Sequence, residues 1–204
     1  MSEISGKWYQ SLFWLLIICT VARTISNGEG DGMLYTLLWF VNVLATAVYG
    51  AVLLKMELFS DHFRMAGLCK AASASVGIVS SAASYFLDGS LLVTLIILVV
   101  IVSAVVDIAG EYQEFAGHSE FARDRDVILS EKWLRLRQWY VGMLAGFAVG
   151  TVCSALLFLP GVIAMLACGI GLVVVSILKI VYVYRMAGLC QDRRREEGAY
   201  DHDF

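Results

Sequence analysis

Six long apolar runs constrain the fold of this chain more than any other feature of its sequence. A bilayer core of about 30 Å is crossed by about 20 apolar residues in a helix, and backbone polar groups in lipid must bond to one another. The six expected spans are residues 8–26, 33–54, 65–86, 91–109, 139–159 and 162–183. The sequence therefore predicts an all-α integral membrane protein with about six transmembrane helices.

The composition agrees with a membrane domain. Hydrophobic residues make up 59% of the chain and charged residues 16%, whereas a soluble domain is about half apolar and about a quarter charged. A net charge of -3 argues against nucleic acid as a partner. We expect residues 1–187 to form one transmembrane domain and residues 188–204 a charged cytoplasmic tail. The first apolar run is taken as a membrane helix, although a cleaved secretory signal stays open.

Lysine and arginine gather in alternate connections, and such residues are retained in the cytoplasm. They are Lys7, Lys55, Arg64, Lys70, Arg123, Arg125, Lys132, Arg135, Arg137, Arg193, Arg194 and Arg195. The other connections carry acids or no charge. The bias predicts three hairpins that point outward, with both termini in the cytoplasm, in a plasma (inner) membrane.

Small residues on two spans predict how the helices pack, because they allow backbones to approach closely. Gly142, Gly146 and Gly150 form a stripe on the fifth span, which we expect to pair tightly with the sixth across Pro160-Gly161. The stripe could also serve a homo-oligomer or a contact with other membrane subunits.

The third span is rich in small and hydroxyl residues, so it should avoid lipid. Ser73, Ser81 and Ser84 lie roughly on one face. That face either packs at the centre of the bundle or lines a water-accessible path.

Few polar or ionisable residues fall inside the expected spans, where they are functional candidates by default. They are Arg23, Asn42, Asp107 and Lys179. Asp107 and Lys179 have opposite charges at similar depth, so an ion pair between them is one expectation, and snorkelling to the interface is the other. We find no histidine in a span, no metal-ligand spacing and no phosphate loop, and we predict neither a metal nor a cofactor.

Residues 110–138 alternate charged and apolar residues with helical periodicity. This segment is predicted to be a cytoplasmic amphipathic helix with a bend at Gly117-His118-Ser119. It could extend the bundle, lie on the membrane surface, or bind a cytoplasmic partner at residues 111–138.

The hexapeptide Arg-Met-Ala-Gly-Leu-Cys occurs twice, from Arg64 to Cys69 and from Arg185 to Cys190. Both copies follow a helix that is expected to return to the cytoplasm. The repeat suggests either a duplicated hairpin or a shared role at the inner edge, such as lipidation of the cysteines or a contact of the arginines with anionic headgroups.

His62 and Cys69 raise one enzymatic alternative, because a cysteine and a histidine can act as nucleophile and base. Their location is similar to that in the membrane cysteine peptidases that process autoinducing peptides. However, the Arg and Gly-Gly-x-His context of that family is missing, since Phe59-Ser-Asp-His62 precedes the cysteine.

Taken together, these patterns favour a non-enzymatic membrane protein that acts through helix packing and oligomerisation, as a scaffold, a regulatory subunit or a pore. The alternative is a small-solute carrier or permease subunit. A carrier should bind its solute among Asn42, the serine face of the third span, and Asp107 or Lys179.

Overall fold

The computed structural model describes the backbone of residues 2–26, 33–86 and 90–200, and the side chains of residues 6–22, 24, 33, 36–79, 81–82 and 93–191. Its elements are α1 (Ser2–Ser26), α2 (Met33–Lys55), the short 3-10 helix η1 (Met56–Phe59), α3 (Asp61–Phe86), α4 (Ser90–Arg123), α5 (Val127–Leu156) and α6 (Phe158–Tyr200). Within these ranges the fold is all-helical, with no strand.

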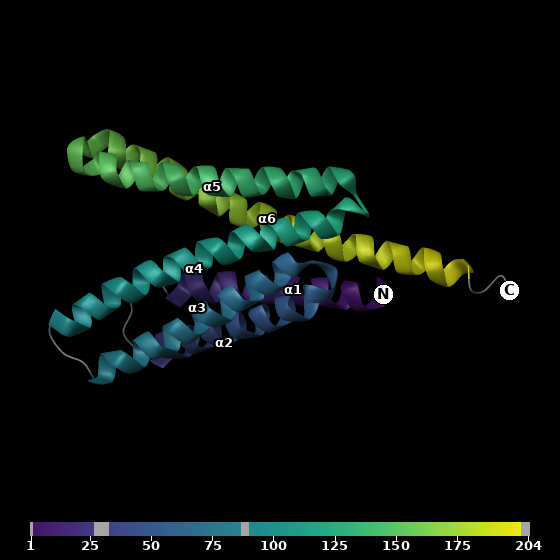
Figure 1. Cartoon of the computed structure of the whole chain (residues 1–204), viewed down its shortest axis with the longest axis horizontal. Coiled ribbons are helices and arrows are strands. Elements are labelled where there is room, and N and C mark those ends of the chain that lie inside the picture. The colour runs from purple at the N-terminus through teal and green to yellow at the C-terminus, as the bar shows by residue number, and fades with distance from the viewer. Residues whose placement is uncertain (1, 27–32, 87–89, 201–204) are drawn as a thin grey trace.

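The six long helices run along a common axis and close into a ring. Each helix packs against its neighbour in the chain, and α1 also packs against α6. The end of α5 meets the start of α6 at one end of the bundle, here named the hairpin end (Figure 1). The start of α1 and the end of α6 lie toward the opposite end, named the termini end. Toward the hairpin end, α5 and α6 diverge from α4 (Figure 1).

Within the described residues, four helices are long and apolar enough to cross a membrane. The qualifying segments are Thr36–Phe59, Val93–Arg123, Val127–Leu156 and Phe158–Gln191. Large apolar side chains such as Ile97, Val152 and Ile170 are more than half exposed on them, which is what lipid contact requires. The chain is therefore a helical bundle with several membrane-compatible helices, while α1 and α3 are not among the four.

The weak hydropathy of α3 follows from its small residues, which allow it to approach α2 closely. A Cβ atom on Gly67 would lie 2.8 Å from the carbonyl oxygen of Gly50 and 2.8 Å from Cγ of Leu54. Real Cβ atoms do not approach other atoms this closely, so the crossing of α2 and α3 depends on glycine.

The expected amphipathic segment 110–138 is not a separate element. α4 continues without a break through Gly117-His118-Ser119 to Arg123, and the chain turns at residues 124–126 instead. The carboxylate of Asp126 accepts a hydrogen bond from the backbone N–H of Leu129 at 3.0 Å, so Asp126 is the N-cap of α5. The prediction of a bend at Gly117-His118-Ser119 is therefore wrong, and the segment extends the bundle.

The turn between α5 and α6 lies at Leu157 rather than at Pro160-Gly161. Pro160 falls in the first turn of α6, where its missing N–H costs no helical hydrogen bond. A Cβ atom on Gly161 would lie 2.3 Å from Cα of Ser154. Glycine therefore allows α5 and α6 to pack together directly after the turn, as their predicted pairing requires.

The main hydrophobic core lies toward the termini end. It combines the early parts of α1, α3 and α5 with the late parts of α2, α4 and α6. Its large, fully buried members include Tyr9, Met56, Phe63, Phe115, Leu129, Trp133 and Met186. Because these side chains are fully buried, this end is closed by packing.

Candidate functional site

The polar face of α4 positions the candidate site. Asp107, Glu111, Glu114 and His118 follow one another at steps of four, three and four residues. This spacing places all four side chains along one face of a helix. Since α4 passes between α3 and α5 in the ring, that face can meet groups from the other helices.

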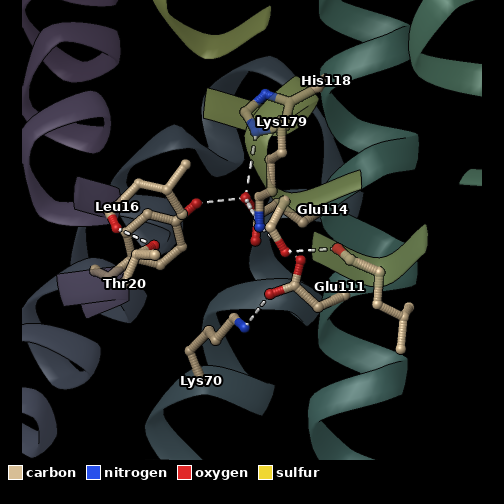
Figure 2. Close-up of polar contacts among 10 residues, drawn as sticks. Leu16, Thr20, Lys70, Glu111, Glu114, His118 and Lys179 are labelled. Carbon is tan, nitrogen blue, oxygen red and sulfur yellow. Dashed lines mark hydrogen bonds and ion pairs between the residues drawn. The ribbon is translucent and has the colours of Figure 1, made fainter. Parts of the chain in front are cut away.

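Two lysines from other helices neutralise this face. Nζ of Lys179 on α6 lies 2.6 Å from Oε2 of Glu111 and 2.8 Å from Oε1 of Glu114. Nζ of Lys70 on α3 lies 2.5 Å from Oε1 of Glu111. Figure 2 shows these four side chains, named the charge cluster, converging from three helices.

The charge cluster is largely shielded from solvent. The side chains of Glu114 and Lys179 are 0% and 5% exposed, and that of Lys70 is 12% exposed. Removing a charge from water costs several kcal/mol, so buried charges persist only when paired. Removal of any one of these charges would therefore deprive a largely shielded partner of an ion pair.

A second set of polar contacts joins the charge cluster to the aromatic core. The hydroxyl of Tyr49 on α2 donates to Oε1 of Glu114. Nε2 of His118 lies 3.5 Å from the same oxygen, and Nδ1 of His118 lies 3.2 Å from the hydroxyl of Tyr9 on α1. The His118 ring stacks on Trp133 of α5, with centroids 4.5 Å apart. The connected polar groups and their contacts thus involve all six helices.

Three buried polar atoms next to this network have no hydrogen-bond partner among the described residues. They are Oε2 of Glu114, Nε2 of His118 and Nε1 of Trp133. The 3.5 Å approach of His118 to Glu114 is an electrostatic contact without hydrogen-bond geometry. Buried atoms of this kind are usually satisfied by an ordered water, so the inner side of the charge cluster has the chemistry of a hydration site.

A cavity of about 740 Å³ lies on the other side of the charge cluster. All six helices contribute to its wall. The lining residues used below are Thr20, Thr24, Trp39, Asn42, Thr46, Tyr49, Lys70, Ser73, Asp107, Glu111, Phe115, Tyr140, Leu172, Val175, Ser176 and Lys179. Its volume lies within the range of about 300–1,000 Å³ that is typical of small-molecule sites.

Four sequence-predicted residues line this cavity together. They are Asn42, Ser73, Asp107 and Lys179, from α2, α3, α4 and α6. The prediction of an ion pair between Asp107 and Lys179 is wrong, because Lys179 pairs with Glu111 and Glu114 instead. Asp107 takes part in no ion pair among the described residues. The reason is position, since Glu111 and Glu114 lie one and two turns further along the same face of α4.

Other polar candidates lie elsewhere. Ser81 is half-buried on α3 and is not among the residues that line the cavity. The side chains of Arg23 and Ser84 lie outside the described residues.

The glycine stripe of α5 is used mainly within the chain. A Cβ atom on Gly146 would lie 2.7 Å from Sγ of Cys168, and one on Gly150 would lie 3.1 Å from Cγ of Met165. Both neighbours belong to α6. A Cβ atom on Gly142 would meet nothing within 4 Å. The stripe therefore packs α5 on α6 and leaves one exposed glycine.

The repeated hexapeptide adopts two different settings. Arg64 to Cys69 begins α3, which leads away from the termini end, whereas Arg185 to Cys190 lies late in α6, which leads toward it. A hairpin duplicated in parallel would place both copies in the same direction, so this arrangement does not support duplication. Arg64 and Arg185 are both more than half exposed. Cys190 is 3% exposed, which leaves no room for a lipid chain.

His62 and Cys69 do not form a catalytic pair in this structure. Nδ1 of His62 lies 2.7 Å from Oε1 of Gln113. His62 and Cys69 lie seven positions apart on α3, which is about 10 Å along a helix axis. The described side chains also include no group of three or more His, Cys, Asp or Glu residues arranged to hold a metal ion.

Sequence reasoning missed Lys70, Glu111, Glu114 and Tyr49 as site residues. The available signal was the spacing of four acidic and histidine residues on one face of α4, which continues the fourth apolar run. That run was ended at residue 109 because the following charges suggested a cytoplasmic segment. Phe115, Trp133 and several other apolar residues of this segment instead enter the core.

The chain matches no protein family, no curated protein and no solved structure.

Proposed function

We propose that this protein is a small-solute carrier whose binding site is the cavity inside the ring of helices. The observation that carries the proposal is the convergence of six helices on one cavity of about 740 Å³ that contains charged and hydroxyl side chains. Ionisable groups are rare inside membranes and usually line solute or ion pathways.

In this proposal all six long helices cross the plasma membrane. The termini end faces the cytoplasm, because the lysines and arginines gather there in the sequence. The aromatic core around Trp133 and Phe115 closes the cavity toward that side. In this proposal a solute enters from the hairpin end, and transport requires the core and the charge cluster to open.

One-sided access distinguishes a carrier from other functions. We would introduce Ser73→Cys on the cavity wall into a cysteine-free variant, and Ile97→Cys on the lipid-facing side of α4 as the control. A membrane-impermeant trimethylammonium-ethyl methanethiosulfonate reagent is then added to either side of sealed liposomes. A carrier predicts labelling of Ser73→Cys from the hairpin side alone and little labelling of Ile97→Cys.

The other outcomes have separate meanings. Rapid labelling of Ser73→Cys from both sides would identify a pore and contradict the carrier proposal. Protection from both sides would contradict any solute path.

The second candidate is a scaffold or regulatory subunit that oligomerises through its exposed glycine surface. Gly142 favours it, because a helix from another chain could approach there without meeting a side chain of α6. The mass of the protein in detergent or nanodiscs, measured by native mass spectrometry, tests this candidate. A defined oligomer that Gly142→Leu dissociates would support it, and a monomer would contradict it.

A further inference from the structure

The charged residues that line the cavity are unequally paired. Lys70, Glu111 and Lys179 belong to the charge cluster, where each ammonium group already contacts a carboxylate. Asp107 also lines the cavity, one turn closer to the hairpin end. It takes part in no ion pair or hydrogen bond among the described residues, and its charge acts on Lys70 only at longer range. The cavity therefore presents one carboxylate that has no direct ion-pair partner among the described residues.

Four hydroxyl groups of the cavity wall offer acceptors rather than donors. Thr20 donates its single hydroxyl hydrogen to the carbonyl of Leu16 at 2.7 Å (Figure 2). The hydroxyls of Thr24, Thr46 and Ser176 likewise donate to carbonyls of their own helices, at 2.8, 2.8 and 3.0 Å.

A hydroxyl that has donated its hydrogen retains only its lone pairs for other contacts. These four residues all line the cavity and come from α1, α2 and α6. A solute that enters it therefore meets hydrogen-bond acceptors on several sides, and such a wall suits a group that carries several N–H donors.

The aromatic wall already holds a cation. Nζ of Lys179 lies 5.8 Å from the ring centroid of Tyr49 and 5.5 Å from that of Phe115. Trp39 and Tyr140 add further rings, and Leu172 and Val175 add apolar surface. Ring faces attract cations. Apolar surface does not compensate an inorganic ion for its lost hydration, so this wall favours a cation that has an apolar part.

We propose that the cavity binds a small organic cation, a primary ammonium with an apolar remainder, and that Asp107 is its counter-ion. This inference rests on the proposed carrier function and deepens it. The ammonium group would lie against Asp107 and the hydroxyl oxygens, and its apolar part against the rings. Asp107 would then be a binding residue, and the charge cluster would form the floor of the site.

Three probes that share a phenyl ring test the charge preference. They are 2-phenylethylammonium as the cation, 3-phenylpropanoate as the anion and phenylalanine as the zwitterion. Binding to the full chain in nanodiscs is measured by isothermal titration calorimetry at pH 7.5. We expect saturable binding of one cation per chain, at least tenfold tighter than that of the anion or the zwitterion.

Variants locate the binding. Asp107→Asn should weaken binding of 2-phenylethylammonium at least tenfold, and Asp107→Glu should retain part of it. Thr46→Val, which removes one acceptor, should weaken it several-fold. Glu131→Gln, an exposed carboxylate on α5, is the matched control and should leave the affinity unchanged. Thermal unfolding of each variant checks that the fold is retained.

Each other outcome overturns the inference. Tighter binding of the anion or the zwitterion, or equal affinity in Asp107→Asn and in the unchanged chain, would show that the site does not select cations through Asp107. If none of the three probes binds, the inference also fails. One-sided labelling of Ser73→Cys would then still support a carrier for another solute, and its absence would remove the carrier proposal as well.

Discussion

The two ends of the bundle are stabilised in different ways. At the termini end, large aromatic side chains from all six helices surround buried charges, and Trp133, Phe63 and Tyr9 are fully buried. At the hairpin end, α5 and α6 diverge from α4, and side chains such as Val152 and Leu157 are largely exposed. One end resembles the interior of a soluble protein, whereas the other is suited to lipid.

This difference shows where the chain can change shape. Breaking the packing at the termini end would expose paired charges and several aromatic rings together. Elements that open at low cost are those with few buried contacts. We therefore expect the hairpin end to move more readily, and the termini end to determine the free energy of unfolding.

The largest effect is expected from Lys179→Ala. This change leaves Glu111 and Glu114 buried without their shared cation, which should lower the free energy of unfolding by about 3–5 kcal/mol. Chemical unfolding in detergent micelles measures the loss. Lys55→Ala, which removes an exposed lysine of α2, is the control and should stay within about 0.5 kcal/mol. Equal effects of the two changes would show that the charge cluster is not buried in the membrane-embedded protein.

Trp133→Ala should cause the next largest loss in the free energy of unfolding, because it leaves a cavity at the centre of the aromatic core. Truncation of a buried tryptophan costs about 3–5 kcal/mol. Trp139→Ala on the same helix removes a ring that is 55% exposed, and it should cost much less. The same unfolding measurement compares them, and a larger loss for Trp139→Ala would mean that the buried and exposed sides of α5 have been assigned wrongly.

Glycine substitutions should show a smaller contrast. Gly67→Ala forces α2 and α3 apart, and overpacking of this kind costs about 1–3 kcal/mol. Gly142→Ala meets open space, and it should stabilise α5 by up to about 1 kcal/mol because alanine favours helix. Thermal unfolding distinguishes the two signs. Destabilisation by Gly142→Ala would indicate that another chain packs there.

The smallest contrast is expected between two valines of opposite exposure. Val183 is fully buried near the termini end, and Val152 is 67% exposed near the hairpin end. Val183→Ala should cost about 1–2 kcal/mol, at about 0.8 kcal/mol for each carbon removed from the core. Val152→Ala should change the free energy of unfolding by less than about 0.5 kcal/mol. Similar losses at both positions would remove the distinction between the ends.

The sequence predicted the helices well because a long apolar run has few alternatives to helix in a membrane. It predicted their ends less well. The charges after residue 109 suggested a segment that is exposed to water. In the structure, Glu111 and Glu114 are instead neutralised by lysines from α3 and α6. The spacing of these acids indicates a polar face of α4, but nothing local in the sequence indicates which lysines will pair with it.

The sequence predicted some of the residues that line the cavity and missed others. Asn42 and Asp107 stood out because polar residues are rare in apolar runs, and both line the cavity. Lys70 was interpreted as a topological signal, since a positive residue near a span end usually faces the cytoplasm. Its inward direction follows from the close contact of α3 with α2 and α4, which composition does not reveal.

The unbroken length of α4 has a consequence for the lipid around the protein. A helix of 34 residues is about 51 Å long, or about 20 Å longer than the hydrocarbon core. Glu111 lies about 31 Å from the start of α4 at 1.5 Å per residue. In the proposed membrane orientation, with α4 entering the hydrocarbon at its first residue, this position is close to the boundary between hydrocarbon and headgroups. A thicker bilayer would place the charge cluster among acyl chains, and hydrophobic mismatch would then favour tilting of the helices or local thinning. Membrane thickness should therefore affect how readily the protein changes conformation.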